Sequence, residues 1–276
     1  MRTFALPRAA AQALRVSSLL ALMLSTHPHV LRAQTAAQPA AAPSPEVPDW
    51  ALPNGPNHKQ HPPPADFHRP SRNFDTPIGI FTGQSDIGAA LVPSSASFDA
   101  GSGQYTINSA GYNIWYTRDE FRFLWKKLSG DVSLAATVNF PVPAPPRDRK
   151  VVLVIRQDLD DDSQEVMTAE HGTGMVHLAS RATKNAEMKD MEYRISGSLF
   201  PATVMPQRIG IQKHGDEISM FISVSGEPMH QLGPPVHVHF NGPFYVGLGF
   251  CPHLATTVDT GTFSAVVLEN TAGKVR

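Results

Sequence analysis

Three polar side chains interrupt apolar faces in consecutive segments of the chain, and their chemistry suits ligand binding. Arg156 shares a face with Val152 and Val154, and His171 and Arg181 interrupt the apolar faces of the next two segments. A guanidinium group on a buried face needs an anionic partner, because an unpaired buried charge is strongly destabilising. The sequence therefore predicts a polar cluster beside an apolar layer.

Two interpretations of this cluster remain open. Either Glu165 or Glu170 pairs with the arginines inside the protein, or the cluster faces a groove and binds a sugar or an acidic ligand. Trp115 precedes an irregular Thr-Arg-Asp segment, where its ring can stack on a sugar or plug the end of the fold. The candidate ligand-binding residues are Trp115, Arg122, Arg156, Glu170, His171 and Arg181.

Two further groups of side chains are candidate metal ligands. The acidic cluster RQDLDDDS offers the oxygens of Asp158, Asp160, Asp161 and Asp162 to a structural calcium ion. It lacks the spacing of an EF-hand, so the alternative is a solvated turn. In the segment HVHF, His237 and His239 share a face and can offer two imidazoles to zinc or copper, with His230 and His253 as further candidates. The alternative is that these histidines lie at the surface.

The sequence contains no strong catalytic motif. The nearest match to the paired carboxylates of jelly-roll glycosidases is EMKDME, where Asp190 and Glu192 share a face but Glu187 does not. A Gly-x-Ser-x-Gly elbow, a phosphate-binding loop and a His-Glu-x-x-His pattern are absent from the sequence. We therefore expect a non-catalytic protein, with a divergent glycoside hydrolase or lyase as the alternative.

The elements that position these residues are predicted to be β-strands. Apolar residues alternate with polar ones in DVSLAATVNF and EISMFISV, and SFDAGSGQYTI reads as a hairpin around a glycine-rich turn. KVVLVIRQD is apolar on both faces, so we expect a central strand that is covered on both sides. About eleven to thirteen such strands predict an all-β jelly-roll sandwich of two antiparallel sheets.

The segment NIWYTRDEFRFLWKKLSGD is dense in aromatic and basic residues. Alternation puts Phe121, Phe123 and Trp125 on one face, and burial of three large aromatic side chains stabilises a fold by several kcal/mol. These residues are therefore expected in the core. Arg122 and Lys126 fall on the other face, which is either a wall of a groove or a solvated surface.

The N-terminal residues predict export. Basic residues precede the apolar run Val16–Leu24, as in a secretory signal peptide, and the run is too short to span a membrane. We expect a signal peptide at 1–33, a disordered linker rich in proline and alanine at 34–74, and the sandwich domain at 75–276.

The net charge of −1 argues against a nucleic-acid partner. Cys251, the only cysteine, is expected to be a buried inert thiol.

The segment GYNIWYTRDEFRFLWKKLSGDVSLAATV resembles a family of concanavalin A-like domains of unknown function, the "regulation of enolase" type. Gly111, Trp115, Asp119 and the pair Gly130-Asp131 carry the likeness, and KVVLVIRQDLDDDS and AEHGTGMVHLASRAT extend it. The resemblance covers most of residues 78–268. It implies a concanavalin A-like jelly roll, found alone or beside enzymes or TolB-type propeller domains, and implies no established activity.

These observations together predict an exported, non-catalytic binding module with carbohydrate as the ligand. The carbohydrate ligand is predicted from the fold class alone. A second hypothesis is an interaction domain that docks on a protein of the cell envelope.

Overall fold

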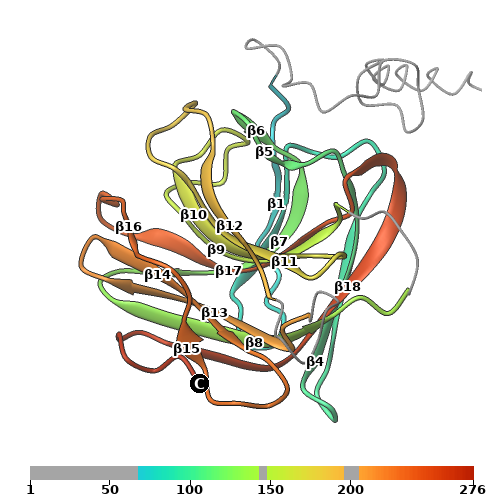
Figure 1. The fold of residues 1–276 in the computed structure, drawn as a ribbon. Coiled ribbons are helices and arrows are strands. Elements are labelled where there is room, and N and C mark those ends of the chain that lie inside the picture. The colour runs from blue at the N-terminus through green and yellow to red at the C-terminus, as the bar shows by residue number, and fades with distance from the viewer. Residues whose placement is uncertain (1–67, 143–147, 196–204) are drawn as a thin grey trace, which may run out of the picture. The chain divides into compact units, whose positions relative to one another are not determined.

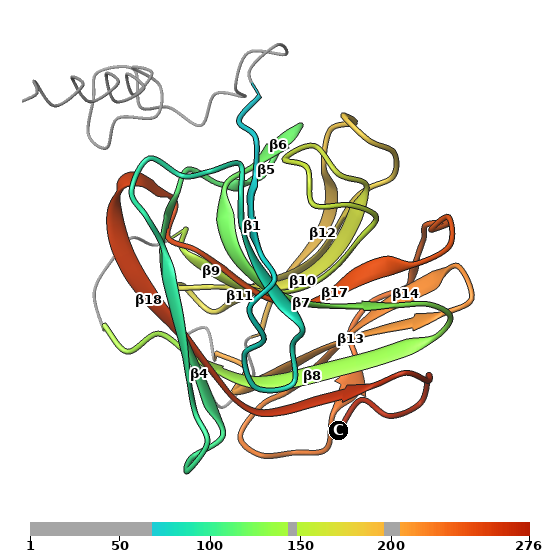
Figure 2. The ribbon, with the colours of Figure 1, turned by 180° about the vertical axis from the view of Figure 1, so that it is seen from behind.

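The described part of the protein is all-β. A computed structural model describes residues 68–142, 148–195 and 205–276, and eighteen strands but no helix occur in these ranges. Two large antiparallel sheets lie one on the other (Figures 1 and 2). This arrangement confirms the predicted two-sheet jelly roll. A search of the same ranges for helices able to cross a membrane finds none.

The first sheet has eight strands, and its order differs strongly from the sequence order. Across the sheet the strands are β1 (Arg72–Phe74), β2 (Gly83–Ile87), β7 (Phe121–Leu128), β17 (Phe244–Cys251), β9 (Lys150–Arg156), β10 (Glu165–His171), β11 (Met175–Arg181) and β12 (Lys189–Arg194). Strand β17 lies between β7 and β9, so a segment near the C-terminus completes the centre of this sheet. The sheet begins at Arg72, three residues before the predicted start of the sandwich domain at Asp75, because β1 pairs with β2.

The second sheet contains the other long strands. Across it lie β15 (His230–Gln231), β14 (Glu217–Ser223), β13 (Arg208–His214), β8 (Val132–Asn139), β18 (Leu254–Glu269), β4 (Gln104–Gly111) and β3 (Ser95–Asp99), with β16 (Val236–His237) paired to β14. The hairpin expected in SFDAGSGQYTI is confirmed as β3 and β4. A separate short hairpin is formed by β5 (Ile114–Trp115) and β6 (Arg118–Asp119).

The main core lies between the two sheets. Leu153 and Ile155 of β9 pack there with Ile209 and Ile211 of β13 and Phe263 of β18, all of them fully buried. The prediction that KVVLVIRQD forms a central strand is confirmed, because every residue of β9 is buried.

The aromatic residues of β7 are buried as predicted, but they lie in a second core. Phe121, Phe123 and Trp125 pack with Val152 and Met167 on the opposite face of the first sheet, away from the second sheet. That face curves around the β5–β6 hairpin (Figure 1). An apolar layer thus covers the outer face of the sheet, and the candidate site lies on this layer.

On the other face of β7, Arg122 is not at a solvated surface, whereas Lys126 is half-buried. Leu124 is fully buried in the main core, and Arg122 is buried beside an acidic partner. Its guanidinium lies 2.9 Å from Asp86 Oδ1 and over the ring of Phe74. The cause is strand β2, which pairs with β7 in the same sheet and places Asp86 directly opposite Arg122.

Candidate functional site

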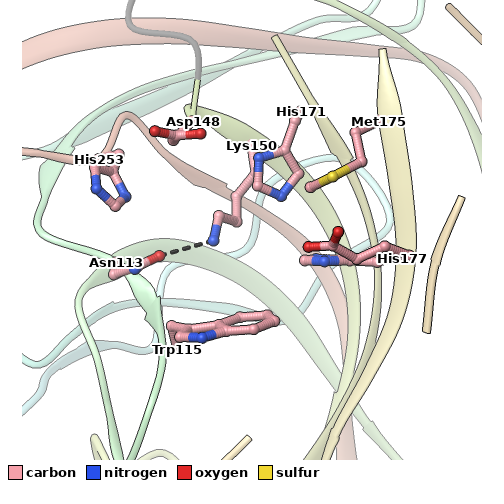
Figure 3. Close-up of a pocket in the computed structure, with 9 residues that line it drawn as sticks. Asn113, Trp115, Asp148, Lys150, His171, Met175, His177 and His253 are labelled. Atoms are coloured by element: carbon pink, nitrogen blue, oxygen red, sulfur yellow. Dashed lines mark hydrogen bonds between the residues drawn. The ribbon is translucent and has the colours of Figure 1, made fainter. Parts of the chain in front are cut away.

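A polar pocket of about 120 Å³ lies on the outer face of the first sheet. Its lining residues are Asn113, Trp115, Asp148, Lys150, His171, Met175, His177, Glu192 and His253. They come from β5, β9, β10, β11 and β12 and from loops beside β5, β9 and β17. Their side chains point toward one another from these separate elements (Figure 3).

The register of the strands explains why these residues meet. Lys150 of β9 lies opposite His171 of β10 and opposite Cys251 of β17. His177 of β11 lies opposite Glu192 of β12. Residues at alternate positions of adjacent strands share a face, so the pocket forms at one end of the sheet.

Lys150 supplies a buried amino group. Its Nζ donates a hydrogen bond of 2.7 Å to Asn113 Oδ1 and lies 5.3 Å from the centre of the Trp115 ring. Burial lowers the pKa of Lys150, because the charged form loses its hydration. A polar ligand in the pocket would meet this amino group as a hydrogen-bond donor.

The imidazole groups of His171 and His177 lie beside Lys150 with unused hydrogen-bonding capacity. They are 5% and 1% exposed, and none of their four ring nitrogens has a hydrogen-bond partner among the described residues. The two ring centres are 4.9 Å apart and the rings are perpendicular. Burial lowers the pKa of both groups, so both are neutral at pH 7. Each neutral ring offers one donor and one acceptor.

Trp115 forms an apolar wall of the pocket. Its ring stacks on His177 with 5.3 Å between the centres and 14° between the planes. The short β5–β6 hairpin carries it over the sheet, and the ring is only partly buried. The pocket thus combines an aromatic surface with donors and acceptors, as small-ligand sites do.

Of the six predicted ligand-binding residues, Trp115 and His171 line this pocket. Arg156 and Arg181 are fully buried at the other end of the same face. Arg156 lies 3.0 Å from Glu165, and Arg181 donates two bonds of 2.7 Å to the carboxylate of Asp119. The structure therefore shows the internal ion pair, one of the two interpretations, and gives these arginines no contact with the pocket.

Glu170 does not line the pocket either. It follows the alternation of β10 onto the opposite face from His171 and is 1% exposed. There it lies beside a second cavity of about 450 Å³ with Arg149 and Phe140. Burial raises its pKa well above 4.5. With Arg122 bound to Asp86, four of the six residues lie away from the pocket.

The four aspartates proposed as calcium ligands face basic side chains. Lys184 contacts Asp158, Asp160 and Asp162, while Asp161 Oδ1 lies 2.9 Å from His68 Nδ1. These protein cations compete for the oxygens that calcium would need. Calcium binding at these residues remains a prediction.

The histidines of HVHF lie at the surface, as the alternative interpretation predicted. His237 lies 3.8 Å from Glu217, and His239 lies 3.1 Å from Asp216, all four side chains being well exposed. In contrast, His253 lines the pocket. It therefore belongs to a different region from the HVHF pair.

Sequence reasoning did not assign the other lining residues to a pocket, although it named His253 as a candidate metal ligand: Asn113, Asp148, Lys150, Met175, His177, Glu192 and His253. Alternation does place Lys150 on the face of Val152 and Arg156, and His177 on the face of Arg181. That signal was present in the sequence. The loop residues Asn113 and His253 carry no such signal, because alternation applies only to strands.

Comparisons with known proteins support the fold. No family model matches the chain, and no match to a curated protein is found. A functionally unknown protein from Saccharomyces cerevisiae is similar in structure, with 13% identity, a TM-score of 0.50, and coverage of 66% of this chain and 95% of its own.

Two other solved structures are less similar. The carbohydrate binding module CBM66 from Bacillus subtilis has a TM-score of 0.43 and 11% identity, over 73% of this chain and 96% of its own. An alginate lyase from Klebsiella pneumoniae has a TM-score of 0.40 and 12% identity, over 65% of this chain and 85% of its own. The fold is defined by the two sheets described above, and the likeness with a TM-score of 0.50 agrees with it. The chain is a jelly-roll β-sandwich with a polar pocket on one sheet.

Proposed function

We propose that this protein is a non-catalytic module that binds a saccharide in the pocket beside Trp115. One observation carries the proposal: two buried imidazoles, His171 and His177, present four ring nitrogens without partners among the described residues. Buried polar groups are nearly always hydrogen-bonded. Ligand hydroxyl groups would supply the missing partners.

The chemistry of the pocket matches a sugar. A hydroxyl group donates and accepts hydrogen bonds, and so does a neutral imidazole, whereas Lys150 donates only. The Trp115 ring offers an apolar surface of the kind that the C–H face of a sugar ring covers. A volume of about 120 Å³ has room for several water-sized groups, so the pocket admits the end of a saccharide.

The two carboxylates of β12 favour binding over hydrolysis. Asp190 and Glu192 lie two residues apart on one strand, and of the two only Glu192 lines the pocket. Glycosidases place two carboxyl groups on either side of the bond they cleave, and the β12 pair lacks this arrangement. Asp148, the other carboxylate of the lining, comes from the loop before β9.

The proposal includes export and membership of the "regulation of enolase" type of concanavalin A-like domains. The basic and apolar N-terminal pattern supports export, although residues 1–67 lie outside the described ranges. The family assignment is supported by the segment from Gly111 to Asp131, which builds the hairpin that carries Trp115.

A glycan panel followed by calorimetry tests saccharide binding. We expect at least one glycan to bind the full chain, and a glycan at 100 times its dissociation constant to stabilise the fold by about 2.7 kcal/mol. Trp115→Ala and His171→Phe should each weaken binding at least about tenfold, because a stacking surface or a hydrogen-bonding ring is lost.

Lys127→Met is the matched control, since Lys127 lies over Tyr245 at the far end of β7 and β17. The affinity of the Lys127→Met variant for the glycan should equal that of the wild type. Binding that is unchanged in both pocket variants, or a panel with no bound glycan, would contradict the proposal.

A further inference from the structure

We propose that His177, Asp190 and Glu192 form a binding site for a divalent transition metal, with Zn²⁺ as the fitting ion. The site lies where β11 and β12 border the pocket, and it goes beyond saccharide binding. One histidine nitrogen and one oxygen from each carboxylate lie within 4.8 Å of one another.

Strand pairing holds these three residues together. His177 of β11 lies directly opposite Glu192 of β12, and Asp190 lies opposite Ala179, two residues further along β11. Positions two residues apart on a strand share a face, so all three side chains leave the sheet on the same side. The backbone of a regular two-strand ladder therefore fixes the spacing of the ligands.

His177 is the observation that points to a ligand. The residue is 1% exposed, and neither ring nitrogen has a hydrogen-bond partner among the described residues. Nδ1 lies 3.7 Å from Asp190 Oδ2, which is too long for a hydrogen bond. A metal ion between the ring and the two carboxylates would bond one ring nitrogen directly and leave the other for a ligand hydroxyl group.

The ring of His177 is also held in place before any ion binds. Trp115 stacks on one face of it at 5.3 Å, and His171 contacts it at a right angle. Its burial keeps the imidazole neutral, and the neutral form carries the lone pair that binds a metal. Little side-chain freedom remains to be lost on binding.

The ligand set selects the ion. An imidazole nitrogen with two carboxylate oxygens suits zinc and its neighbours, whereas calcium prefers oxygen ligands alone. Zinc ligands at about 2.0–2.2 Å lie roughly 3.4 Å from one another in a tetrahedron. Asp190 and Glu192 are open to solvent, so small rotamer changes can close the present spacing.

Charge balance favours a divalent ion. The two carboxylates together carry a charge of −2, which a Zn²⁺ ion neutralises. Lys150 lies in the same pocket and opposes a cation, but its amino group donates to Asn113 and its single charge is smaller than that of the acid pair. Three protein ligands leave the fourth tetrahedral position for water or for another ligand.

A second cluster among the described residues has ligand atoms within the same 4.8 Å of one another, but its histidine has hydrogen-bond partners. His68, Asp161 and Asp162 lie close together, yet His68 Nδ1 already lies 2.9 Å from Asp161 and its Nε2 contacts Arg118. Arg118 and Lys184 also contact the carboxylate of Asp162. The histidine of that cluster therefore already has close protein partners on both ring nitrogens, whereas the only such contact of His177 within the described ranges is with Asp190, itself a proposed ligand.

Titration of the full chain with Zn²⁺ and Co²⁺ after chelator treatment tests the site. We expect one equivalent to bind with the highest affinity, and Co²⁺ to give a visible absorption band and quench Trp115 fluorescence. The double variant Asp190→Asn, Glu192→Gln should weaken this binding about 100-fold or more and abolish the quenching, because two of three ligands are lost. Both changes are at accessible side chains, so folding should be retained.

The matched control is Asp216→Asn, Glu217→Gln, which removes the same charges beside the exposed His237 and His239. This control variant should bind the first, tightest equivalent of metal with the affinity of the wild type. The proposal is overturned if the pocket variant binds as tightly as the wild type, or if the control variant is the one that loses the metal. The titration contains no saccharide, so its result is independent of the proposed function.

Discussion

At the scale of single residues, Asp119 is the side chain on which the most buried charges depend. It is fully buried and accepts two bonds of 2.7 Å from Arg181, while Arg156 Nη2 lies 3.4 Å away. Glu165 is the second acid of this cluster. Two carboxyl groups and two guanidinium groups thus lie together inside the protein, where burial raises the pKa of Glu165 to about 7.

Asp119→Asn should destabilise the protein by about 3–5 kcal/mol, because it leaves buried guanidinium charge without its partner. Chemical denaturation measures the loss. Asp216→Asn, at an exposed pair with His239, is the control and should change the free energy of unfolding by no more than about 1 kcal/mol. Equal stability of the Asp119 variant and the wild type would contradict the dependence of these buried charges on Asp119.

At the scale of elements, strands β7 and β17 approach so closely that glycine is required between them. A Cβ on Gly247 would lie 1.8 Å from the carbonyl oxygen of Leu124. On β2, a Cβ on Gly83 would lie 2.3 Å from the ring of Trp125. These glycines leave room for the aromatic layer beneath the pocket.

Gly247→Ala should cost about 1–3 kcal/mol, because the clash is with backbone that cannot turn away. Thermal or urea unfolding gives the measurement. Gly101→Ala is the comparison, since its Cβ would meet only the Asp99 carboxylate, at 3.2 Å. That variant should stay within about 0.5 kcal/mol of the wild type. A loss of similar size in both would argue against close strand packing as the cause.

At the scale of the whole molecule, the folded state changes the protonation of buried acids. Burial raises the pKa of Glu170 well above 4.5, whereas the unfolded chain gives this group its ordinary value. At pH values between the pKa of unfolded Glu170 and that of folded Glu170, the folded protein holds a proton that the unfolded chain has lost. Rising pH therefore destabilises the fold across this window.

Glu170→Gln should remove this effect. The stability of this variant relative to the wild type should rise by up to about 1.4 kcal/mol per pH unit as the pH increases above the ordinary glutamate pKa toward the raised pKa of the buried group. Denaturation of both proteins at several pH values gives the slope. Glu217→Gln, at an exposed side chain, should show no such slope, and a flat difference for Glu170→Gln would contradict a buried neutral acid.

Much of the fold followed from local pattern. A glycine-rich turn predicted the β3–β4 hairpin, a run apolar on both faces predicted the doubly buried strand β9, and alternation predicted the shared face of Phe121, Phe123 and Trp125. It also placed Arg156 with Val152 and Val154. These predictions succeeded because the side chains of a strand alternate whatever the strand pairs with.

The site needed the tertiary structure, because alternation assigns a face but not a neighbour. Asn113 and Lys150 are 37 positions apart, and Asp119 and Arg181 are 62 apart. Only the order of the strands brings them together, with β17 inserted between β7 and β9. The sequence by itself determined the strands, their faces and the two-sheet class. The pairing of distant strands decided which polar side chains meet and which are sealed inside, since that pairing depends on contacts across the whole domain.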